Sequence, residues 1–397
     1  MSYSERNPAI DMLRALTMCL MIFVNNLWTI KGVPHWMLHS QTMEDFMGLS
    51  DIVFPSFLFA MGMSIPYAIE NRFRKGYDAA STLWHILKRA FALIVMGVFT
   101  VNAGSGLHLG PQSRNLFLIL MTVGFFLVWN EYRNTPRVLK TVLQLLGTAL
   151  LVWMVLRYRT DDGHIFQPKW WGILGLIGWA YLACAVIYLI ARDRLKYLCL
   201  AWLVFIAVCA LSTVTRAGHP VLDLQQPNIF DKLRDILRLD NGAHHALAMG
   251  GVILSVVGVK YASKWKERRR ILSALAAAAV FVGLGFLAHR WFIVSKNLAT
   301  LPWVLWITAL CILLYALLQL LVRHGITGWF RLIKPAGTAT LTTYMVPYVL
   351  IGFCSITGWN FWGRFSGIWG ILYCIGYVAL VLAITWCLGK LKIKMKI

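Results

Sequence analysis

Residues 34–66 read PHWMLHSQTMEDFMGLSDIVFPSFLFAMGMSIP, a polar connection followed at once by a long apolar run. The connection contains two histidines and three carboxylates, namely His35, His39, Glu44, Asp45 and Asp51. The run after Asp51 carries no charged residue as far as Pro66 and is apolar enough to enter a membrane-spanning helix. We therefore expect a membrane scaffold that holds this polar connection at one of its ends.

The composition of the whole chain supports a membrane protein. Of its 397 residues, 59% are hydrophobic and 14% are charged, and the mean hydropathy is +0.66, whereas soluble domains carry about 25% charged residues. No stretch between the apolar runs is long enough for a soluble domain. We predict an all-α polytopic membrane protein with one integral domain over residues 1–397. Its transmembrane helices, about 11–12 by length and hydropathy, would lie near residues 11–30, 51–69, 86–103, 114–130, 138–156, 170–191, 197–214, 244–262, 270–289, 302–322, 337–356 and 367–388.

The net charge of +22 could suggest a nucleic-acid partner, but the placement of Lys and Arg argues against one. These residues cluster in alternate connections between the apolar runs, as the positive-inside rule requires. Counted from Arg6 onward, one side carries about twice as many as the other. We therefore predict that both termini face the cytoplasm, that the connection holding His39 faces the opposite side, and that the bilayer is the partner.

All eight cysteines lie in apolar segments without a CxxC pair, so we predict neither a metal site nor a disulfide framework. The first apolar run is not followed by a small-residue cleavage pattern, so the first helix is expected to stay as an anchor.

Two polar groups lie in the first apolar run, where an ionisable side chain costs about 2.5–3.5 kcal/mol on insertion scales. Asp11 and Arg14 are spaced i, i+3 near its cytoplasmic start and could pair on one helix face. A neutralised helix end with a snorkelling arginine is the alternative. Asn25 and Asn26, near the opposite end, indicate a polar interior close to the outer leaflet.

Asp51 and His39 each allow two interpretations. Asp51 could be a plain N-cap of the second span, or a carboxylate that also orients a histidine. His39, twelve residues upstream, could be an ordinary surface residue. Its neutral imidazole would also suit general-base work, since polar residues of both adjoining helices are within reach.

Lys88 and Arg89 are expected to begin the third span on the inside, and Asn102 to end it on the outside. Cations at a helix start oppose the helix dipole, which topology alone could explain. The alternative is a site for an anionic group such as a nucleotide phosphate.

The longest outside connection covers residues 215–245. Apolar residues at helical spacing predict an amphipathic helix on the membrane surface or over a pocket, at Ile229, Leu233, Ile236 and Leu237. His244 and His245 would follow at the start of the eighth span, where they could bind an anion or line an acceptor pocket, as could His289 with Arg290.

Several of these residues together carry a family likeness. Asp11-x-x-Arg14, LMIFVNN at 20–26, His39 in an outside loop and DIVFPSFLFAMGMS at 51–64 resemble the heparan-α-glucosaminide N-acetyltransferase family, lysosomal and bacterial. Arg89 with Asn102 and the segment GTATLTTY at 337–344 are also similar to that family.

The resemblance implies an enzyme that takes acetyl from cytosolic acetyl-CoA and delivers it to the amino group of a glucosamine-type sugar across the membrane. It puts His39 at the active-site histidine, Asn25 at its polar partner and Asp51 at the carboxylate that opens the next helix. It further implies acetyl-CoA as co-substrate, with no metal, held by residues among Asp11, Arg14, Lys88, Arg89, Asn102 and Tyr344. A bacterial inner-membrane homodimer with its active loop in the periplasm is the expected setting.

Two points of the chemistry stay open at this stage. His39 could act as a general base toward the sugar amine or carry the acetyl group itself. The rival activities are transport of an amino sugar or N-acetylglucosamine and O-acetylation of an envelope polysaccharide. The polar residues do not repeat between two halves of the chain, as the inverted repeats of many transporters would require.

Overall fold

The fold was analysed in a computed structural model that describes residues 3, 7–104, 107, 112–133, 135–160, 162–213, 215–216, 221, 241–359 and 364–397. Within these residues the chain forms helices and isolated bridges but no sheet, which confirms the all-α prediction. The helices are α1 (Pro8–Leu27), η1 (His35–Met37), α2 (Leu49–Arg74), α3 (Ala79–Val101), α4 (Ser113–Trp129), α5 (Arg137–Arg157), α6 (Gly172–Ala191), α7 (Leu195–Ser212), α9 (Ala243–Lys260), η2 (Ala262–Lys264), α10 (Glu267–His289), α11 (Leu301–Arg323), α12 (Phe330–Thr338), α13 (Thr340–Ile356) and α14 (Gly367–Lys390). Arg6 and the helix expected around 229–237 lie outside the described residues.

Ten helices of the described part are long and apolar enough to cross a membrane, or eleven if one bent pair counts as a single span. The protein is therefore a multi-pass membrane protein. The predicted fourth span, near 114–130, coincides with α4, which at 17 residues is shorter than the ten helices counted here. The span predicted over 337–356 differs from the structure: it is broken, because α12 and α13 meet at an angle of 88° beside Ala339.

The third predicted span also begins in a different place. Helix α3 starts at Ala79, where the Asp78 side chain accepts a hydrogen bond from the Ser81 N–H as an N-cap. Lys88 and Arg89 therefore lie more than two turns inside the helix and do not begin it, because the cap and not the first apolar residue sets the boundary. Asn102 is the C-cap, as predicted.

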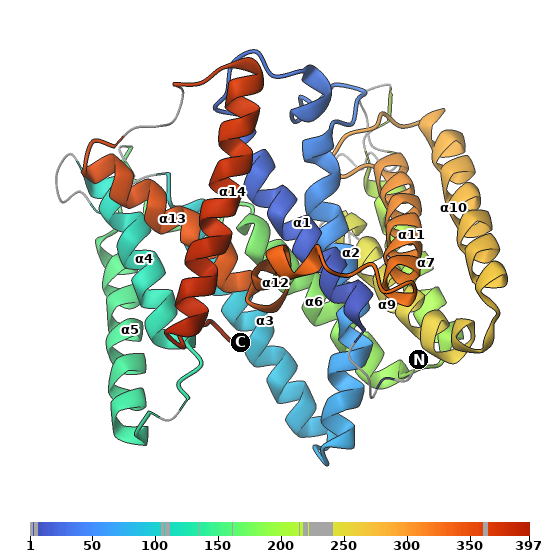
Figure 1. Ribbon diagram of the computed structural model, residues 1–397, viewed down its shortest axis with the longest axis horizontal. Coiled ribbons are helices and arrows are strands. Elements are labelled where there is room, and N and C mark those ends of the chain that lie inside the picture. The colour runs from blue at the N-terminus through green and yellow to red at the C-terminus, as the bar shows by residue number, and fades with distance from the viewer. Residues whose placement is uncertain are drawn as a thin grey trace.

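Helices α1 and α2 form the centre of the bundle (Figure 1). α2 packs against α9, α1, α6 and α11, while α1 also contacts α12 and α14. α4 and α5 pair with each other and join the rest mainly through α13, and α10 joins mainly through α11. In Figure 1 the connection between α1 and α2 lies at the top, and both labelled termini lie in the lower half.

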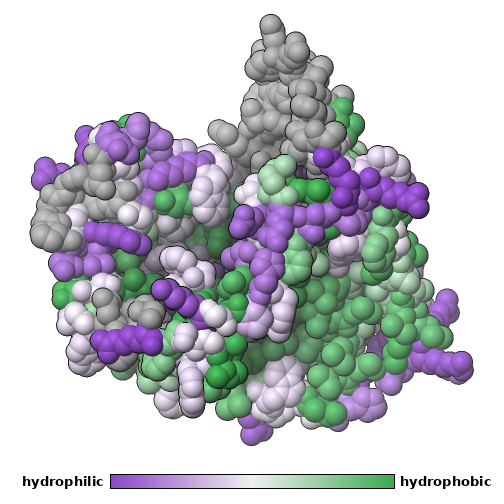
Figure 2. Space-filling view, turned by 90° about the horizontal axis from the view of Figure 1, so that it is seen from above, coloured by the Kyte–Doolittle hydropathy of each residue, from purple (hydrophilic) through white to green (hydrophobic). Residues whose placement is uncertain are grey.

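The outer helices present apolar surfaces that suit lipid. Only 17% of the apolar window of α5, and the same share in α10, is buried inside the protein. Figure 2, which views the molecule from above Figure 1, shows hydrophilic residues in patches across this end and hydrophobic residues along one side. Such an apolar surface can stay exposed in a membrane protein because hydrocarbon and not water covers it.

Glycines allow α2 and α9 to approach closely. A Cβ atom at Gly251 of α9 would overlap the Phe59 carbonyl of α2, and one at Gly62 of α2 would overlap the Ala248 carbonyl of α9. Small residues at such crossings let helix backbones pack tightly in a membrane. This contact fixes α2, the helix that begins beside His39.

We expect Gly251→Ala to destabilise the fold by about 1–3 kcal/mol, because the added methyl group has to push two backbones apart. Gly258→Ala is the matched control on α9: nothing lies within 4 Å of its added Cβ, and alanine is worth up to about 1 kcal/mol more than glycine in a helix. Thermal unfolding in detergent would show the midpoint of Gly251→Ala falling and that of Gly258→Ala unchanged or higher. Equal midpoints would contradict the tight α2–α9 contact.

Candidate functional site

The polar connection is folded onto the first turn of α2. Gly48 is the N-cap of that helix, and a Cβ atom there would overlap the Leu38 carbonyl, so the connection can close on itself only at a glycine. Ser50 Oγ donates to the Met37 carbonyl at 2.6 Å and holds η1 against the helix. The connection therefore returns to its own end, which brings His39 over Asp51.

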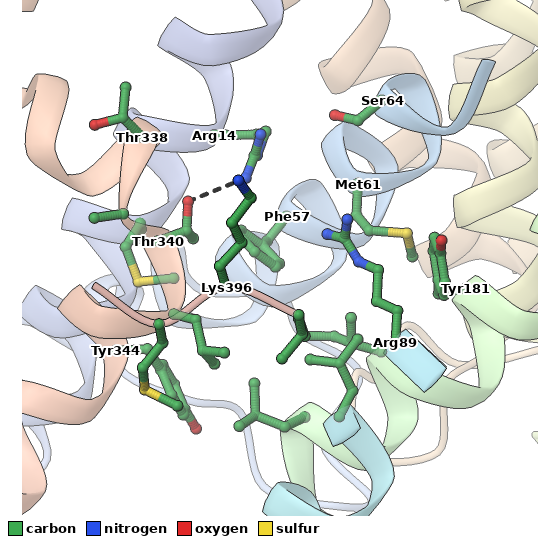
Figure 3. A pocket seen from close by; sticks show the side chains of 18 of the residues that line it. Arg14, Phe57, Met61, Ser64, Arg89, Tyr181, Thr338, Thr340, Tyr344 and Lys396 are labelled. Carbon is green, nitrogen blue, oxygen red and sulfur yellow. Dashed lines mark hydrogen bonds between the residues drawn. The ribbon is translucent and has the colours of Figure 1, made fainter. Parts of the chain in front are cut away.

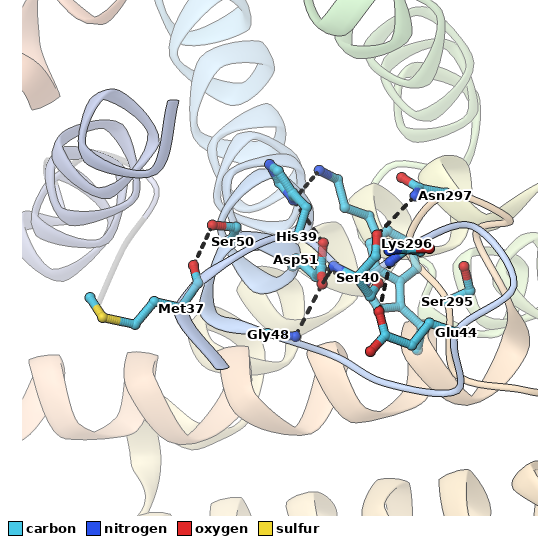
Figure 4. Close-up of polar contacts among 12 residues, drawn as sticks. Met37, His39, Ser40, Glu44, Gly48, Ser50, Asp51, Ser295, Lys296 and Asn297 are labelled. Atoms are coloured by element: carbon cyan, nitrogen blue, oxygen red, sulfur yellow. Dashed lines mark hydrogen bonds and ion pairs between the residues drawn. The ribbon is translucent and has the colours of Figure 1, made fainter. Parts of the chain in front are cut away.

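Asp51 caps the helix and also holds His39. It occupies the third helical position and not the N-cap position, and its Oδ2 accepts the backbone N–H groups of Gly48 and Ser40, each at 3.0 Å. Its Oδ1 lies 2.8 Å from His39 Nδ1 (Figure 4). The Asp51 side chain is fully buried, whereas that of His39 is 37% exposed. A buried carboxylate thus fixes a histidine whose ring still reaches solvent.

Lys296 is a third polar group at this site. It lies in the connection between α10 and α11, and its Nζ is 3.1 Å from His39 Nδ1. Burial lowers the pKa of the Lys296 ammonium from its ordinary value, while the Asp51 carboxylate opposes this shift. His39 Nδ1 therefore lies between the Asp51 carboxylate and the Lys296 ammonium.

The two connections are tied to each other by hydrogen bonds that keep Lys296 in place. Asn297 Nδ2 donates to the Ser40 carbonyl at 3.2 Å, and Ser295 Oγ donates to the Thr42 carbonyl at 3.0 Å. Phe46 N–H donates to the Val294 carbonyl at 3.2 Å. Residues 40–46 and 294–297 are thus one assembly, although about 250 residues separate them in sequence.

An ion cluster closes the outer side of this assembly. Asp45 accepts from the Val294 N–H at 2.7 Å and lies 2.8 Å from His289 Nε2 and 2.7 Å from an Arg216 guanidinium nitrogen. Burial alone would raise the pKa of Asp45, but the Val294 N–H, His289 and Arg216 together hold that pKa below its ordinary value. His289, which from the sequence could bind an anion or line an acceptor pocket, thus pairs with a carboxylate of the protein itself.

His244 and His245 lie deeper than expected for an acceptor site. Both are buried, at 9% and 3% exposed. The His244 ring contacts Phe54 and Trp303, and the His245 ring contacts Phe205. Trp303 in turn donates its indole N–H to the Asp51 carbonyl at 3.1 Å. These aromatic side chains thus pack around the first turns of α2 beneath Asp51.

Asn25 is exposed near the end of α1 and makes no hydrogen bond with His39 or Asp51 among the described residues. Its position on the helix is nevertheless informative. Asn25 follows Arg14 by eleven residues, or about three turns of 3.6 residues, so both lie on one face of α1 with Met18 and Met21 between them. This face leads about 16 Å along the helix axis from Arg14 to Asn25.

A cavity of about 320 Å³ opens along that face of α1. Its walls come from α1, α2, α3, α6, the α12–α13 break and the C-terminal segment 394–397. Most of the lining is apolar, with Arg14 beside Thr340 and Arg89 beside Met61 and Tyr181 (Figure 3). The cavity has the character of a ligand site: an apolar channel with a few charged groups.

The predicted cofactor residues fall into two groups. Arg14, Arg89 and Tyr344 line the cavity. Arg14 donates to Thr340 Oγ1 at 3.2 Å and lies 3.9 Å from Asp11, the pair predicted from their spacing. Arg89 stacks over the Tyr181 ring at 5.0 Å, and its buried Nε has no hydrogen-bond partner among the described residues.

The other group lies away from the cavity. Asp11 is not among the residues that line it, and lies 3.9 Å from Arg14, which is. The exposed Lys88 lies over the Trp84 ring at 5.0 Å. Asn102 is fully buried and donates to the carbonyls of Val98 and Gln167, each at 2.7 Å, so it joins the end of α3 to the segment before α6.

A second, basic hollow adjoins the cavity, with a volume of about 480 Å³. We call it the basic vestibule, after the six cationic residues in its lining: Arg133, Arg331, Lys334, Lys390, Lys392 and Lys394. It shares Glu131, Arg133, Thr338, Ala339 and Lys394 with the cavity, so the two spaces adjoin. An anionic group would meet this charge before it reached the apolar channel.

Glu131 organises the wall between the vestibule and the cavity. It lies 2.7 Å from Lys396 Nζ and 3.1 Å from Arg133, and its backbone N–H donates to the Lys394 carbonyl at 2.8 Å. The hydrogen bond from Lys396 lowers the pKa of Glu131, with Arg133 assisting and partial burial opposing. Met395 N–H donates to Thr342 Oγ1 at 3.0 Å, which fixes the C-terminal segment against α13.

Comparison with known proteins identifies the family to which this chain belongs. A family model described as "Domain of unknown function (DUF5009)" matches residues 6–221, more than half of the chain. The protein is a member of the DUF5009 family. The matched region contains α1, α2, α3 and α6 with the His39–Asp51 pair, whereas Lys296 and the C-terminal segment lie beyond it.

Two curated relatives of this DUF5009 member carry the name heparan-alpha-glucosaminide N-acetyltransferase, which confirms the predicted resemblance. The Mus musculus protein is 30% identical over 157 residues, covering 40% of this chain and 20% of the relative. The Homo sapiens protein is 32% identical over 108 residues, covering 27% of this chain and 15% of the relative. The matched region thus spans at most a fifth of the length of these relatives.

Sequence reasoning missed three parts of the site. Lys296 looked like an ordinary residue of a short outside loop, and no local pattern marks it. The Asp45–His289–Arg216 cluster joins the end of α10 to two separate connections. The third is the C-terminal tail KLKIKMKI at 390–397, where the density of Lys residues could have indicated an anion site.

Proposed function

We propose that this protein is a membrane-embedded acetyltransferase that moves acetyl from cytoplasmic acetyl-CoA to the amino group of a glucosamine-type sugar on the extracytoplasmic side. The observation that carries the proposal is the His39–Asp51 pair: a buried carboxylate, held by two N–H groups, orients a histidine that is still exposed. The names of the two curated relatives support the same activity.

His39 is assigned the proton transfer. If Nδ1 carries the ring proton and donates a hydrogen bond to Asp51, then Nε2 has a free lone pair. Nε2 can then accept a proton from the sugar ammonium. The resulting amine attacks the thioester carbonyl, the C–N bond forms and the C–S bond breaks. The thiolate takes the proton held by His39, and the second proton of the nitrogen leaves to solvent as the amide forms. Asn25 is assigned the donor to the oxyanion of this step, a contribution commonly worth about 3–4 kcal/mol.

The cavity and the basic vestibule are assigned to acetyl-CoA. The phosphates would lie against the cations of the vestibule, with Arg14 and Arg89 further in. The apolar walls suit the pantetheine arm, which would follow the face of α1 from Arg14 toward Asn25. This arrangement agrees with the excess of Lys and Arg assigned to the cytoplasmic side.

His39 could alternatively carry the acetyl group as an acetyl-imidazole before the sugar takes it. Single-turnover kinetics would distinguish the two routes. A burst of free CoA without acceptor, with acetyl trapped on His39 at a competent rate, would establish the covalent route. Release of CoA only when acceptor is present would establish direct transfer.

The remaining predictions belong to the same proposal. We assign the whole chain to one integral domain, locate it in a bacterial inner membrane with the His39 connection in the periplasm, and expect homodimers through lipid-facing helices. An O-linked acceptor in an envelope polysaccharide would use the same chemistry.

A transporter is the rival, and one observation favours it. The break between α12 and α13 lines the cavity with Thr338, Ala339 and Thr340, and broken helices around a central cavity are typical of secondary transporters. A transporter of amino sugars has no use for a thioester, so CoA binding separates the two classes. At a CoA concentration of 100 Kd, mass action would stabilise the fold by about 2.7 kcal/mol.

The deciding experiment is transfer of radiolabelled acetyl from acetyl-CoA to glucosamine by purified protein in detergent. We expect labelled N-acetylated sugar to accumulate with time and protein concentration. No transfer to any amino sugar, together with no thermal stabilisation by CoA, would leave the transporter as the better assignment.

Arg89 and Lys88 provide a matched pair for the CoA end of the site. We expect Arg89→Gln to raise the KM for acetyl-CoA about 10–100-fold, because a hydrogen bond to a charged group is worth about 1.5–3 kcal/mol. Lys88→Gln removes a neighbouring cation that does not line the cavity and should leave KM nearly unchanged. Steady-state kinetics with varied acetyl-CoA gives the comparison; equal effects of both variants would mean that Arg89 acts only through topology or net charge.

A further inference from the structure

His39 Nδ1 has two neighbours of opposite charge. Asp51 Oδ1 lies 2.8 Å away and Lys296 Nζ lies 3.1 Å away (Figure 4). Among the described residues these are the charged groups that contact the His39 ring. The ring is thus held between a carboxylate from α2 and an ammonium from the α10–α11 connection.

The two neighbours act in opposite directions on the charge of the ring. A carboxylate at hydrogen-bond distance favours the imidazolium, whereas an ammonium at similar distance disfavours it. With Asp51 alone, a general base in this position would tend to hold a proton already. With Lys296 beside it, the net charge of its two neighbours is zero.

We propose that Lys296 is a positioning residue that keeps His39 in its uncharged, base-competent state by offsetting the Asp51 carboxylate. The proposal rests on the proposed function, in which His39 takes a proton from the acceptor ammonium. The same charge also favours the return of that proton: once His39 is an imidazolium, repulsion from Lys296 assists its release to the departing thiolate. Asp51 thus fixes the orientation of the ring, and Lys296 favours the loss of the proton that His39 has taken up.

Other charged groups around the connection already have partners. Glu44, on the same connection, pairs with His35 at 3.0 Å and accepts from the Gln41 N–H at 2.8 Å. Asp45 pairs with His289 and Arg216 on the outer side. On the elements packed beneath, His244 faces Phe54 and Trp303. The balance at His39 therefore depends mainly on Asp51 and Lys296.

Hydrogen bonds of the neighbouring residues also hold Lys296 in position. Its two neighbours bond to the His39 connection, Ser295 through the Thr42 carbonyl and Asn297 through the Ser40 carbonyl. Burial lowers the pKa of Lys296, so the fold places an ammonium where solvation is poorer than at the surface. A charge held at such cost next to a histidine is typical of functional sites.

The test compares Lys296→Met, Lys296→Arg and Asn297→Ala with the unmodified protein. The first readout is the NMR titration of His39 in histidine-labelled protein, assigned by the signal that disappears in His39→Gln. Lys296→Met removes the ammonium but keeps the apolar stem, so the His39 midpoint should move to higher pH. Lys296→Arg retains the charge and should restore the original midpoint. Asn297→Ala loosens the connection without changing its charge, and should leave the midpoint in place.

The second readout is the pH dependence of kcat/KM for acetyl transfer. In Lys296→Met its rising limb should move to higher pH with the NMR midpoint, lowering the rate near pH 7 about 10-fold or more, while the KM for acetyl-CoA stays unchanged. A superimposable midpoint in Lys296→Met would overturn the proposal. So would a shift to lower pH, since Lys296 would then favour the imidazolium form of His39 and not disfavour it. A shift of the NMR midpoint in protein that transfers no acetyl would retain the role of Lys296 and reject the proposed function.

Discussion

His39→Gln is expected to lower kcat for acetyl transfer by about 10²–10⁴-fold, the range that a positioned general base contributes. Glutamine can keep a hydrogen bond to Asp51 through its amide N–H, so the connection should stay folded. It cannot accept a proton from an ammonium, which removes the chemistry assigned to Nε2. The measurement is the rate of transfer at saturating acetyl-CoA, with CoA-induced thermal stabilisation as the check that the cavity is intact.

His35→Gln is the matched control for this variant. His35 lies on the same connection four residues earlier, its side chain is 60% exposed, and it pairs with Glu44 at 3.0 Å. Loss of this exposed pair should change stability by no more than about 1 kcal/mol and leave transfer nearly unchanged. Equal losses in both variants would indicate that the connection as a whole, and not the His39 imidazole, supports the activity.

The helical scaffold could be predicted from sequence because the membrane leaves few alternatives. A backbone in hydrocarbon must satisfy its hydrogen bonds within each segment, so each long apolar run had to become a helix. The break at Ala339 could not be predicted from hydropathy, since no charged residue interrupts 337–356. Here Gly337 packs against the Asp11 carbonyl of α1, and this tertiary contact accompanies the sharp turn of the chain.

The candidate site was predictable only where its residues are close in sequence. His39 and Asp51 are twelve residues apart, so a loop and a helix start were enough to suggest their contact. Lys296 is 257 residues from His39, and the tertiary fold brings it there through the packing of α11 against α2 and the hydrogen bonds between the two connections. The resemblance implied one acetyl-CoA site with Arg14, Lys88 and Arg89 among its residues, but nothing in their spacing showed that Arg14 and Arg89 line the cavity and Lys88 does not.

Asp51→Asn should also lower kcat, by about 10²–10⁴-fold, because it favours the wrong tautomer of His39. Oδ2 of Asp51 accepts two backbone N–H groups, so the amide oxygen of an asparagine must take that place. Its NH₂ group then faces His39 Nδ1 and donates to it. The imidazole proton is forced onto Nε2, and the lone pair that would accept a proton from the sugar is lost.

The pattern of kinetic constants separates this effect from general damage to the fold. Asp51→Asn should lower kcat while the KM for acetyl-CoA and the CoA-induced thermal stabilisation remain, because the cavity lies further along α2. Raising the pH should not rescue it, since the fault is the tautomer and not the charge. Ser50→Ala, which loses the adjacent 2.6 Å bond to the Met37 carbonyl without facing His39, is the control for a loosened connection. If Ser50→Ala lost as much kcat as Asp51→Asn, Asp51 would be a helix cap only, and the orientation of His39 would have to come from Lys296 and the segment that carries it.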